Sequence, residues 1–316
     1  MSASVDVVGL GLNAMDTICV IDRFPQPNTK TGIRTVRVEP GGQVATALTT
    51  CNRFGLHARY IGSVGDDALG KAQLESLHAA QLDTEFVRVV PGAVTQFAVI
   101  LLEEGIGERT ILWHHDPRLN YPVEKLNRDV VVSGKVLHLD GCDTAAALQA
   151  AMWARESGIP VVIDIDELYD DSTHELLQNV DYLIAAEDFA DRLLGRMAPE
   201  EAVKAIADRY GCAVVGITLG ERGAMFLDHG RILHSPGFKV TVADTTGAGD
   251  VFHGAFIYGL LQGWGLEDIA RFANAAAALK CTQIGARRGI PDLTQVMDLI
   301  PPPPPGEDGA KRRERV

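Results

Sequence analysis

Apolar and polar residues follow two different rhythms along this chain. From Lys135 onward, short apolar runs alternate with longer stretches that have helical periodicity. The predicted strands are Val136–Leu139, Val161–Ile165, Tyr182–Ala185 and Ala213–Thr218, with helices at residues 144–157 and 198–210. Strands that alternate with helices of this length predict a parallel sheet covered by helices on both faces. An apolar strand at Val5–Leu10 and a helix at Gln43–Phe54, closed by Gly55, extend the same pattern toward the N-terminus.

Four other strand-like runs leave this βα rhythm, namely Asp16–Ile21, Thr31–Val38, Thr95–Leu102 and Arg109–Trp113. Pro25 and Pro27 exclude a helix after the first run, and the second alternates charged and apolar residues as a half-exposed strand does. These runs predict a small β-sheet lid formed from about residues 16–40 and 94–115. A further hairpin, Ala224–Leu227 with Arg231–Leu233, predicts an antiparallel edge of the main sheet.

Two glycine-rich segments resemble nucleotide-binding loops without meeting their requirements. Gly9–Ala14 nearly matches a dinucleotide fingerprint, but a strand follows where that motif needs a helix. Gly65–Ala72 nearly matches a Walker A loop, yet Ala72 lacks the hydroxyl that would contact magnesium, and two acids in the loop would repel phosphates. Asp66 is instead predicted to be the N-cap of a helix that runs to Leu77.

Composition narrows the classes of partner. The 316 residues are 46% hydrophobic and carry a net charge of −13, which argues against nucleic-acid or membrane-surface partners. Five scattered cysteines without C-x-x-C spacing, and an N-terminus without a basic and apolar leader pattern, favour a cytoplasmic protein. Residues 301–316, with five prolines and dense charge, are predicted to be a disordered tail.

The strongest candidate for chemistry is the stretch Asp244–Leu261, a polar turn that passes into an apolar helix. The small residues Gly247, Ala248 and Gly249 leave backbone N–H groups uncovered at the start of that helix, which favours anion binding. Asp250 stands in the same first turn, where a carboxylate can accept the proton of an attacking hydroxyl. The alternative is a helix that merely begins with glycine and aspartate.

The run D-T-x-G-A-G-D-x-x-x-G-A-F at Asp244–Phe256 resembles the C-terminal signature of the ribokinase (PfkB) family of carbohydrate kinases. The resemblance covers about residues 4–295, and the tract Arg271–Pro291 is similar to the branch of ketohexokinase-like and sulfofructose-kinase-like enzymes. It implies a ribokinase-like, three-layer α/β domain over residues 1–300, with a mostly parallel central sheet and the small β-sheet lid. The implied reaction transfers the γ-phosphoryl group of ATP, with Mg²⁺, to a primary hydroxyl of a small sugar, and a homodimer is expected.

The resemblance also implies roles for residues of the central motif and the nucleotide side. Asp250 would be the catalytic base, with Gly247, Ala248 and Gly249 forming the anion hole, while Asp244 and Thr246 would support a monovalent cation such as K⁺. The implied nucleotide-site residues are Thr218, Gly220, Gly223, Glu187 and Asn274. From spacing alone, the 218–223 segment is equally consistent with a tight turn.

One departure concerns magnesium. Relatives often carry an N-x-x-E motif that organises magnesium and phosphates, whereas this chain reads Ala186-Glu187-Asp188-Phe189 there. Glu187 or Asp188 are the candidate substitutes. Asp164 and Asp166, at the end of a predicted strand, are candidates for a water-mediated magnesium contact, with loop or helix capping as the alternative.

On the acceptor side the resemblance implies roles for Asp16, Gly41 and Gly42. Thr46 replaces an asparagine that relatives often have, which predicts a changed acceptor. The run His114-His115-Asp116 has no third metal ligand nearby in sequence, which favours a lid or pocket role. Two alternatives to a sugar kinase remain at this point: a nucleoside kinase on the same fold, and a non-catalytic sugar-binding regulatory protein suggested by the missing N-x-x-E pair.

Overall fold

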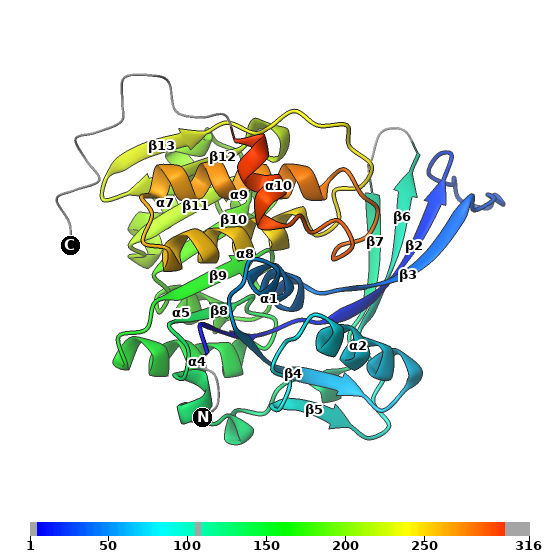
Figure 1. The fold of residues 1–316 in the computed structure, drawn as a ribbon, viewed down its shortest axis with the longest axis horizontal. Coiled ribbons are helices and arrows are strands. Elements are labelled where there is room, and N and C mark those ends of the chain that lie inside the picture. Colours follow the sequence, from blue (N-terminus) through cyan, green and yellow to red (C-terminus); the bar gives the residue numbers. More distant parts are fainter. Residues whose placement is uncertain (1–4, 105–108, 301–316) are drawn as a thin grey trace.

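The computed structural model describes residues 5–104 and 109–300, which form two β-sheets with helices packed around the larger one (Figure 1). In spatial order the described strands of the large sheet are β13 (Arg231–Ser235), β12 (Ala224–Asp228), β11 (Val214–Thr218), β10 (Tyr182–Ala186), β9 (Val161–Ile165), β8 (Val136–Leu139), β1 (Val7–Leu10), β4 (Ala58–Gly65) and β5 (Val87–Val90). Pairs from β11 to β5 are parallel, while β12 and β13 add the antiparallel edge predicted from sequence. The predicted tail, residues 301–316, lies outside the described residues.

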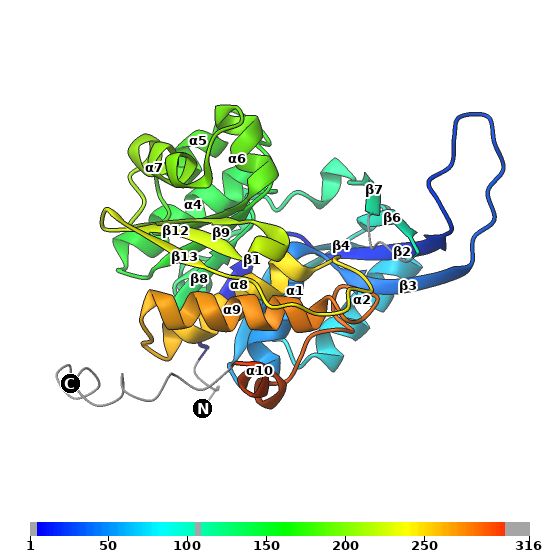
Figure 2. The same cartoon turned by 90° about the horizontal axis from the view of Figure 1, so that it is seen from above.

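Helices cover both faces of the large sheet, as the alternating pattern predicted (Figure 2). One face carries α4 (Thr144–Glu156), α5 (Thr173–Leu177), α6 (Glu187–Leu194) and α7 (Pro199–Tyr210), and the other carries α1 (Gln43–Arg53), α8 (Ala248–Leu261) and α9 (Leu266–Lys280). The remaining described helices are α2 (Ala68–Ala79), α3 (Arg128–Val131) and α10 (Leu293–Leu299), together with single 3₁₀ turns at Pro117–Leu119, Val123–Lys125 and Gly220–Arg222. No helix in the described part of the chain is long and apolar enough to cross a membrane.

The side chains of strand β9 alternate between the two faces of the large sheet. Val161, Ile163 and Ile165 belong to the apolar cluster on the α4 and α7 face, whereas Val162 belongs to the cluster on the α8 face. Because side chains alternate along a strand, Asp164 shares the face of Val162 and therefore lies toward α8. A carboxylate thus occupies a core-facing position at the carboxyl end of a central strand, where open α/β sheets bind ligands.

The small sheet projects from one side of the main domain and has the order β3-β2-β6-β7 (Figures 1 and 2). Its strands are β2 (Ala14–Ile21), β3 (Thr35–Gly41), β6 (Phe97–Glu103) and β7 (Arg109–His114). Two details differ from the sequence-based expectation. Strand β2 begins before Asp16, so that this residue lies inside the lid sheet, and residues 31–34 precede β3 and are not part of it.

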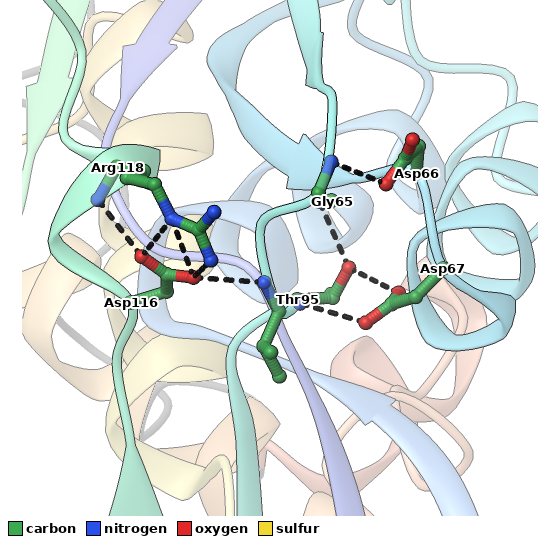
Figure 3. Close-up of polar contacts among 8 residues, drawn as sticks. Gly65, Asp66, Asp67, Thr95, Asp116 and Arg118 are labelled. Atoms are coloured by element: carbon green, nitrogen blue, oxygen red, sulfur yellow. Dashed lines mark hydrogen bonds and ion pairs between the residues drawn. The ribbon is translucent and has the colours of Figure 1, made fainter.

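The segment that enters the lid before β6 is anchored, through Thr95, to the turn after β4 (Figure 3). The Asp67 carboxylate caps α2 through Gly70 N–H at 2.8 Å, and it accepts hydrogen bonds from the backbone and the hydroxyl of Thr95 at 2.9 and 2.6 Å. The predicted N-cap, Asp66, is therefore wrong by one residue. Asp66 accepts instead from Gly92 N–H at 2.8 Å, because the helix begins one position later.

The segment that leaves the lid after β7 is held beside this anchor. Asp116 accepts from Val94 N–H at 2.9 Å and from the Arg118 guanidinium at 2.6 Å (Figure 3). Its neighbour His115 contacts Gln96 and Asn120 through its two ring nitrogens, at 2.5 Å each. The run at residues 114–116 is therefore part of the lid hinge, and no group of three His, Cys, Asp or Glu in the described chain is arranged to hold a metal.

Candidate active site

The start of α8 forms an open helix N-terminus. Gly247 is its N-cap with a left-handed φ of 80°, and a Cβ there would lie 2.7 Å from the Cβ of Ala286, which makes glycine necessary. No side chain caps this end, and a Cβ at Gly249 would meet no atom within 4 Å. The Ala248 N–H already donates to the Thr245 carbonyl at 3.2 Å. The space for an anion therefore lies in front of Gly249, where the helix dipole is positive.

Asp250 lies in the first turn of α8 among other acidic groups. Burial, and then the negative charge of Asp164, raise the pKa of Asp250 to about 8. His253, which no sequence motif indicated, partly opposes this shift. Its Nδ1 lies 2.8 Å from the Gly249 carbonyl oxygen and 3.2 Å from the Asp164 carboxylate. A carboxylate with a pKa near neutrality is suited to accept a proton from a substrate hydroxyl.

Asp16 lies on strand β2 of the lid sheet, close enough to Asp250 for the two charges to interact. It is 6% exposed, and the two glycines beside it have steric reasons to be glycine. A Cβ at Gly41 would lie 2.1 Å from the Asp16 carboxylate, and one at Gly42, whose φ is 90°, would lie 2.4 Å from Asn13 Cα. Burial raises the pKa of Asp16 to about 6, against the opposing charge of Arg287, and Asp244 adds to the rise. The Asp16 charge in turn contributes to the raised pKa of Asp250.

Arg287 is a buried cation of this site that sequence reasoning missed. Its guanidinium donates to the Gly41 carbonyl at 2.6 Å, to the Ser76 hydroxyl at 3.2 Å and to the Thr46 hydroxyl at 3.4 Å. Thr46 was predicted to contact the acceptor directly, and the structure places its buried hydroxyl against this arginine. A motif search could not find the residue, because its partners lie more than 200 positions away in the sequence.

The loop after β11 brings together the glycines predicted for the nucleotide side. Gly220 and Gly223 have positive φ angles of 59° and 91°, and Gly220 has open space around its missing Cβ. A Cβ at Gly223 would lie 2.0 Å from the Ser235 carbonyl oxygen, so this glycine is required by packing. Thr218, at the end of β11, donates to the Ala185 carbonyl at 3.4 Å. The amide nitrogen of the buried Asn274 donates to the Ser235 carbonyl at 3.0 Å, so Asn274 holds the segment against which Gly223 packs.

The positions of the missing N-x-x-E motif face different environments. Ala186 is exposed and Phe189 is buried in the apolar core under α6, where a glutamate would leave a charge unpaired. The Glu187 carboxylate lies 2.5 Å from the Arg222 guanidinium of the loop after β11. Glu187 therefore adjoins the predicted nucleotide loop, although its own charge is already paired.

Asp244 and Thr246 form the turn that leads into the anion site. The Asp244 carboxylate is fully buried and accepts from Thr246 N–H at 2.8 Å and from Gly285 N–H at 2.9 Å. The Thr246 hydroxyl is buried and has no hydrogen-bond partner among the described residues. Lys280, another residue missed from sequence, donates to the Asp244 carbonyl at 2.8 Å. Burial lowers the pKa of Lys280, and the charge of Asp244 opposes that shift.

The lid contacts the main domain close to this turn. Arg109 of β7 donates a hydrogen bond to the hydroxyl of Thr245. Glu39 of β3 lies 3.2 Å from the guanidinium of Arg288. These contacts join β7 and β3 of the lid to the turns at Thr245 and Arg288 of the main domain.

A buried carboxylate beside an open helix N-terminus, at the carboxyl ends of a parallel sheet and under a lid, defines a phosphotransferase that acts on a hydroxyl group. The sequence matches the pfkB family of carbohydrate kinases over residues 3–293, and the chain belongs to this family.

Individual relatives agree in fold and length. The chain is 30% identical to an ATP-dependent ribose-1-phosphate kinase of Halopiger xanaduensis, with 90% of this chain and 94% of the relative covered. It is 26% identical to a nucleoside kinase of Methanothermobacter thermautotrophicus, with 94% and 96% covered. The solved structure of Arabidopsis thaliana ribokinase complexed with ribose and ATP superposes with a TM-score of 0.81 at 26% identity, covering 94% of this chain and 98% of that one. The finer resemblance to the ketohexokinase-like branch stays a prediction.

Proposed function

We propose that this enzyme transfers the γ-phosphoryl group of ATP to a primary hydroxyl of a small sugar or sugar derivative. The observation that carries this proposal is the position of Asp250, which combines a pKa raised to about 8 with a place at the mouth of the open α8 N-terminus. In one helical turn, the base can take the proton of the acceptor hydroxyl and the anion site can stabilise the charge of the transferring phosphoryl group. The Arabidopsis relative, whose structure contains ribose and ATP, supports the same pair of substrates.

Each group of the site has one task in the proposed reaction. The Asp16 carboxylate accepts hydrogen bonds from sugar hydroxyls and orients the acceptor. Asp250 accepts the proton of the attacking hydroxyl, whose oxygen bonds to the γ-phosphorus as the bond from phosphorus to the ADP oxygen breaks. The backbone at Gly247–Gly249 stabilises the charge of the transferring phosphoryl group. Closure of the lid through Arg109 and Glu39 limits the access of water and therefore the hydrolysis of ATP.

The acidic groups around Asp250 fit a magnesium ion that ATP brings with it. Asp164 lies near the end of β9 and Asp166 follows two residues later, and burial, then the negative charge of Asp166, raise the pKa of Asp164. Such carboxylates favour a hydrated Mg²⁺ held mainly by phosphates, with one or two protein ligands. We therefore assign Asp164 and Asp166 to this contact, ahead of Glu187. When bound, Mg²⁺ neutralises charge on the phosphates of ATP.

A nucleoside is the second candidate acceptor, because the nucleoside kinase of M. thermautotrophicus covers almost the same length of chain. The experiment is an ADP-release assay with purified protein, ATP and Mg²⁺, against a panel of pentoses, hexoses, sugar acids, sugar phosphates and nucleosides. Turnover with a sugar or sugar derivative supports the proposal, and turnover with adenosine alone favours the nucleoside kinase. ADP release that no acceptor increases would contradict both.

We also propose a homodimer formed through the outer face of the lid. The strand register places Val36 and Val38 of β3, Val99 and Leu101 of β6, and Leu112 of β7 on the face opposite Asp16. Val36, Val38 and Leu112 are 55%, 55% and 59% exposed, which is unusual for a contiguous apolar surface of a monomer. Sedimentation should give twice the chain mass for the native protein and the single chain mass for Leu112→Glu.

A further inference from the structure

Lys280 is a fully buried lysine at the end of α9. It is 0% exposed, and its ammonium donates to the Asp244 carbonyl oxygen at 2.8 Å and to the Gln283 carbonyl oxygen at 3.5 Å. Lysine is almost never buried unless its charge is compensated, because an isolated ammonium loses its hydration. Here the compensation comes from carbonyl oxygens and from the nearby Asp244 carboxylate.

The surroundings of this ammonium are those that a small monovalent cation would need. Backbone carbonyl oxygens are its direct partners, and the Asp244 carboxylate lies in the same turn. That carboxylate is held in place by the N–H groups of Thr246 and Gly285, so the turn cannot reorganise freely around a second ion. A free cation placed among these oxygens would also meet the like charge of the ammonium.

The same turn determines the geometry of the anion site. Asp244 is three residues before Gly247, the N-cap of α8. Its carboxylate accepts a hydrogen bond from the N–H of Thr246, the residue just before that N-cap. Gly285 adjoins Ala286, whose Cβ lies against Gly247. The ammonium therefore connects the end of α9 to the loop on which the open helix N-terminus depends.

We propose that Lys280 is a tethered cation that takes the place of a bound potassium ion and positions the anion-site loop, so that the enzyme needs no monovalent cation. This inference rests on the proposed kinase function for its activity test, and it replaces the expectation of a K⁺ site at Asp244 and Thr246. Lys280 is a positioning residue, because it acts through Asp244 and the Gly247–Gly249 backbone and does not contact the transferring group.

The first test compares the native enzyme in potassium, sodium and tetramethylammonium chloride at one ionic strength. Turnover, Tm and the increase of Tm produced by ADP should be the same in all three salts. Stimulation of turnover or of the ADP-induced Tm shift by potassium would overturn the proposal. This arm requires no mutation and is decisive even if variants fold poorly.

The second test removes the ammonium. Lys280→Ala leaves a space among the same oxygens, and turnover in tetramethylammonium chloride should fall by about ten- to a hundredfold, the usual scale for a lost outer partner of a charged site. Potassium or ammonium chloride should restore part of that loss. Lys280→Met fills the space without charge, so that its loss should not be restored by either salt. Lys204→Ala, an exposed lysine of α7, is the matched control and should behave as the native protein does.

The variants also separate this inference from the proposed function. If no acceptor is phosphorylated in any salt, the proposed function fails, but the ADP-induced Tm shift still reports on Lys280. Restoration of that shift by potassium in Lys280→Ala alone supports the tethered cation. A Lys280→Met protein that has lower Tm but native turnover and ADP response would show a purely structural role and contradict the proposal.

Discussion

Replacement of Arg287 by methionine should change the pH dependence of sugar binding without affecting ATP. Arg287 is the cation whose charge opposes the burial-driven rise in the Asp16 pKa, and it fixes the Gly41 carbonyl beside that carboxylate. With a pKa of about 6, Asp16 is mostly ionised at pH 7 and can accept sugar hydroxyls. An opposite charge nearby typically lowers the pKa of a carboxyl by about 1–3 units, so its removal should raise the Asp16 pKa by an amount of this order.

The sign of the effect follows from which form binds sugar. Asp16 must be ionised, so kcat/KM for the sugar in the native enzyme should show a second fall as the pH drops through about 6, below the fall near pH 8 that Asp250 produces. Asp16 faces the charges of Arg287, Asp244 and Asp250, and it pairs across the strands with Glu39. In Arg287→Met the fall that Asp16 produces should begin at higher pH, and at pH 7 the loss should be about twofold for a rise of one unit and about ninetyfold for a rise of three units. At about pH 9 half or more of the kcat/KM should return, because at least half of Asp16 is again ionised at that pH.

The assay measures kcat/KM for the sugar and KM for ATP from about pH 5 to about pH 9. Arg287→Lys should be intermediate, because a lysine keeps the charge but cannot reach three separate acceptors. Arg128→Met is the control, since its exposed guanidinium pairs with Glu156 and neither residue has a role in the proposed site. Arg287→Met should also lower the free energy of unfolding by about 1–3 kcal/mol or more, because the Gly41 carbonyl loses its closest partner. An unchanged acid limb in Arg287→Met, or a change confined to KM for ATP, would refute the reasoning.

Three further outcomes are expected. In Asp164→Asn, the fall of kcat/KM that the titration of Asp250 produces near pH 8 should move to lower pH, because the negative charge that raises the Asp250 pKa is removed. A fall that stays at the same pH would mean that Asp250 does not titrate there. Asp67→Ala should lower the free energy of unfolding by about 2–4 kcal/mol at pH 7, since it loses the α2 cap and two lid-anchoring hydrogen bonds, whereas Asp66→Ala loses one hydrogen bond and should cost less. The pKa of Asp67 is lowered in the folded protein, so the difference in stability between Asp67→Ala and Asp66→Ala should disappear as the pH falls through that lowered pKa. Equal Tm values for the two variants at pH 7 would contradict this prediction. Removal of Pro301–Val316 should leave Tm and kinetics unchanged, because this segment has no apolar face to pack; a decrease of several degrees would contradict that expectation.

The layered fold could be predicted because its signals are local. Each central strand is a short apolar run with polar or turn-forming residues at both ends. Strands β8 and β9 have the predicted bounds. The two halves of the lid could be paired from their strand patterns, although they are about 50 residues apart. Sequence does not determine a boundary where two similar residues stand side by side. Asp66 and Asp67 are both suitable caps, and the structure selects Asp67, whose carboxylate accepts hydrogen bonds from Gly70 and Thr95.

The residues that support the site could not be predicted in the same way. Asp250 and its glycines form a contiguous motif, whereas Lys280 and Arg287 act on turns that are distant in sequence. A lysine in the last turn of a helix usually lies in solvent beside the helix dipole, and nothing in its neighbours indicates full burial. His253 looks like one more residue of an apolar helix until the structure places it against Asp164.

The central claim is that Asp250 is the base of a phosphoryl transfer to a sugar hydroxyl. Its most direct test is the turnover of Asp250→Asn with ATP, Mg²⁺ and the best acceptor of the panel, beside its Tm and its affinity for ADP. The amide has nearly the same shape but cannot accept the proton, so kcat should fall by about a hundredfold or more while Tm and ADP affinity stay close to native. A variant that folds, binds ADP and keeps most of its turnover would contradict the assignment of Asp250 as the base.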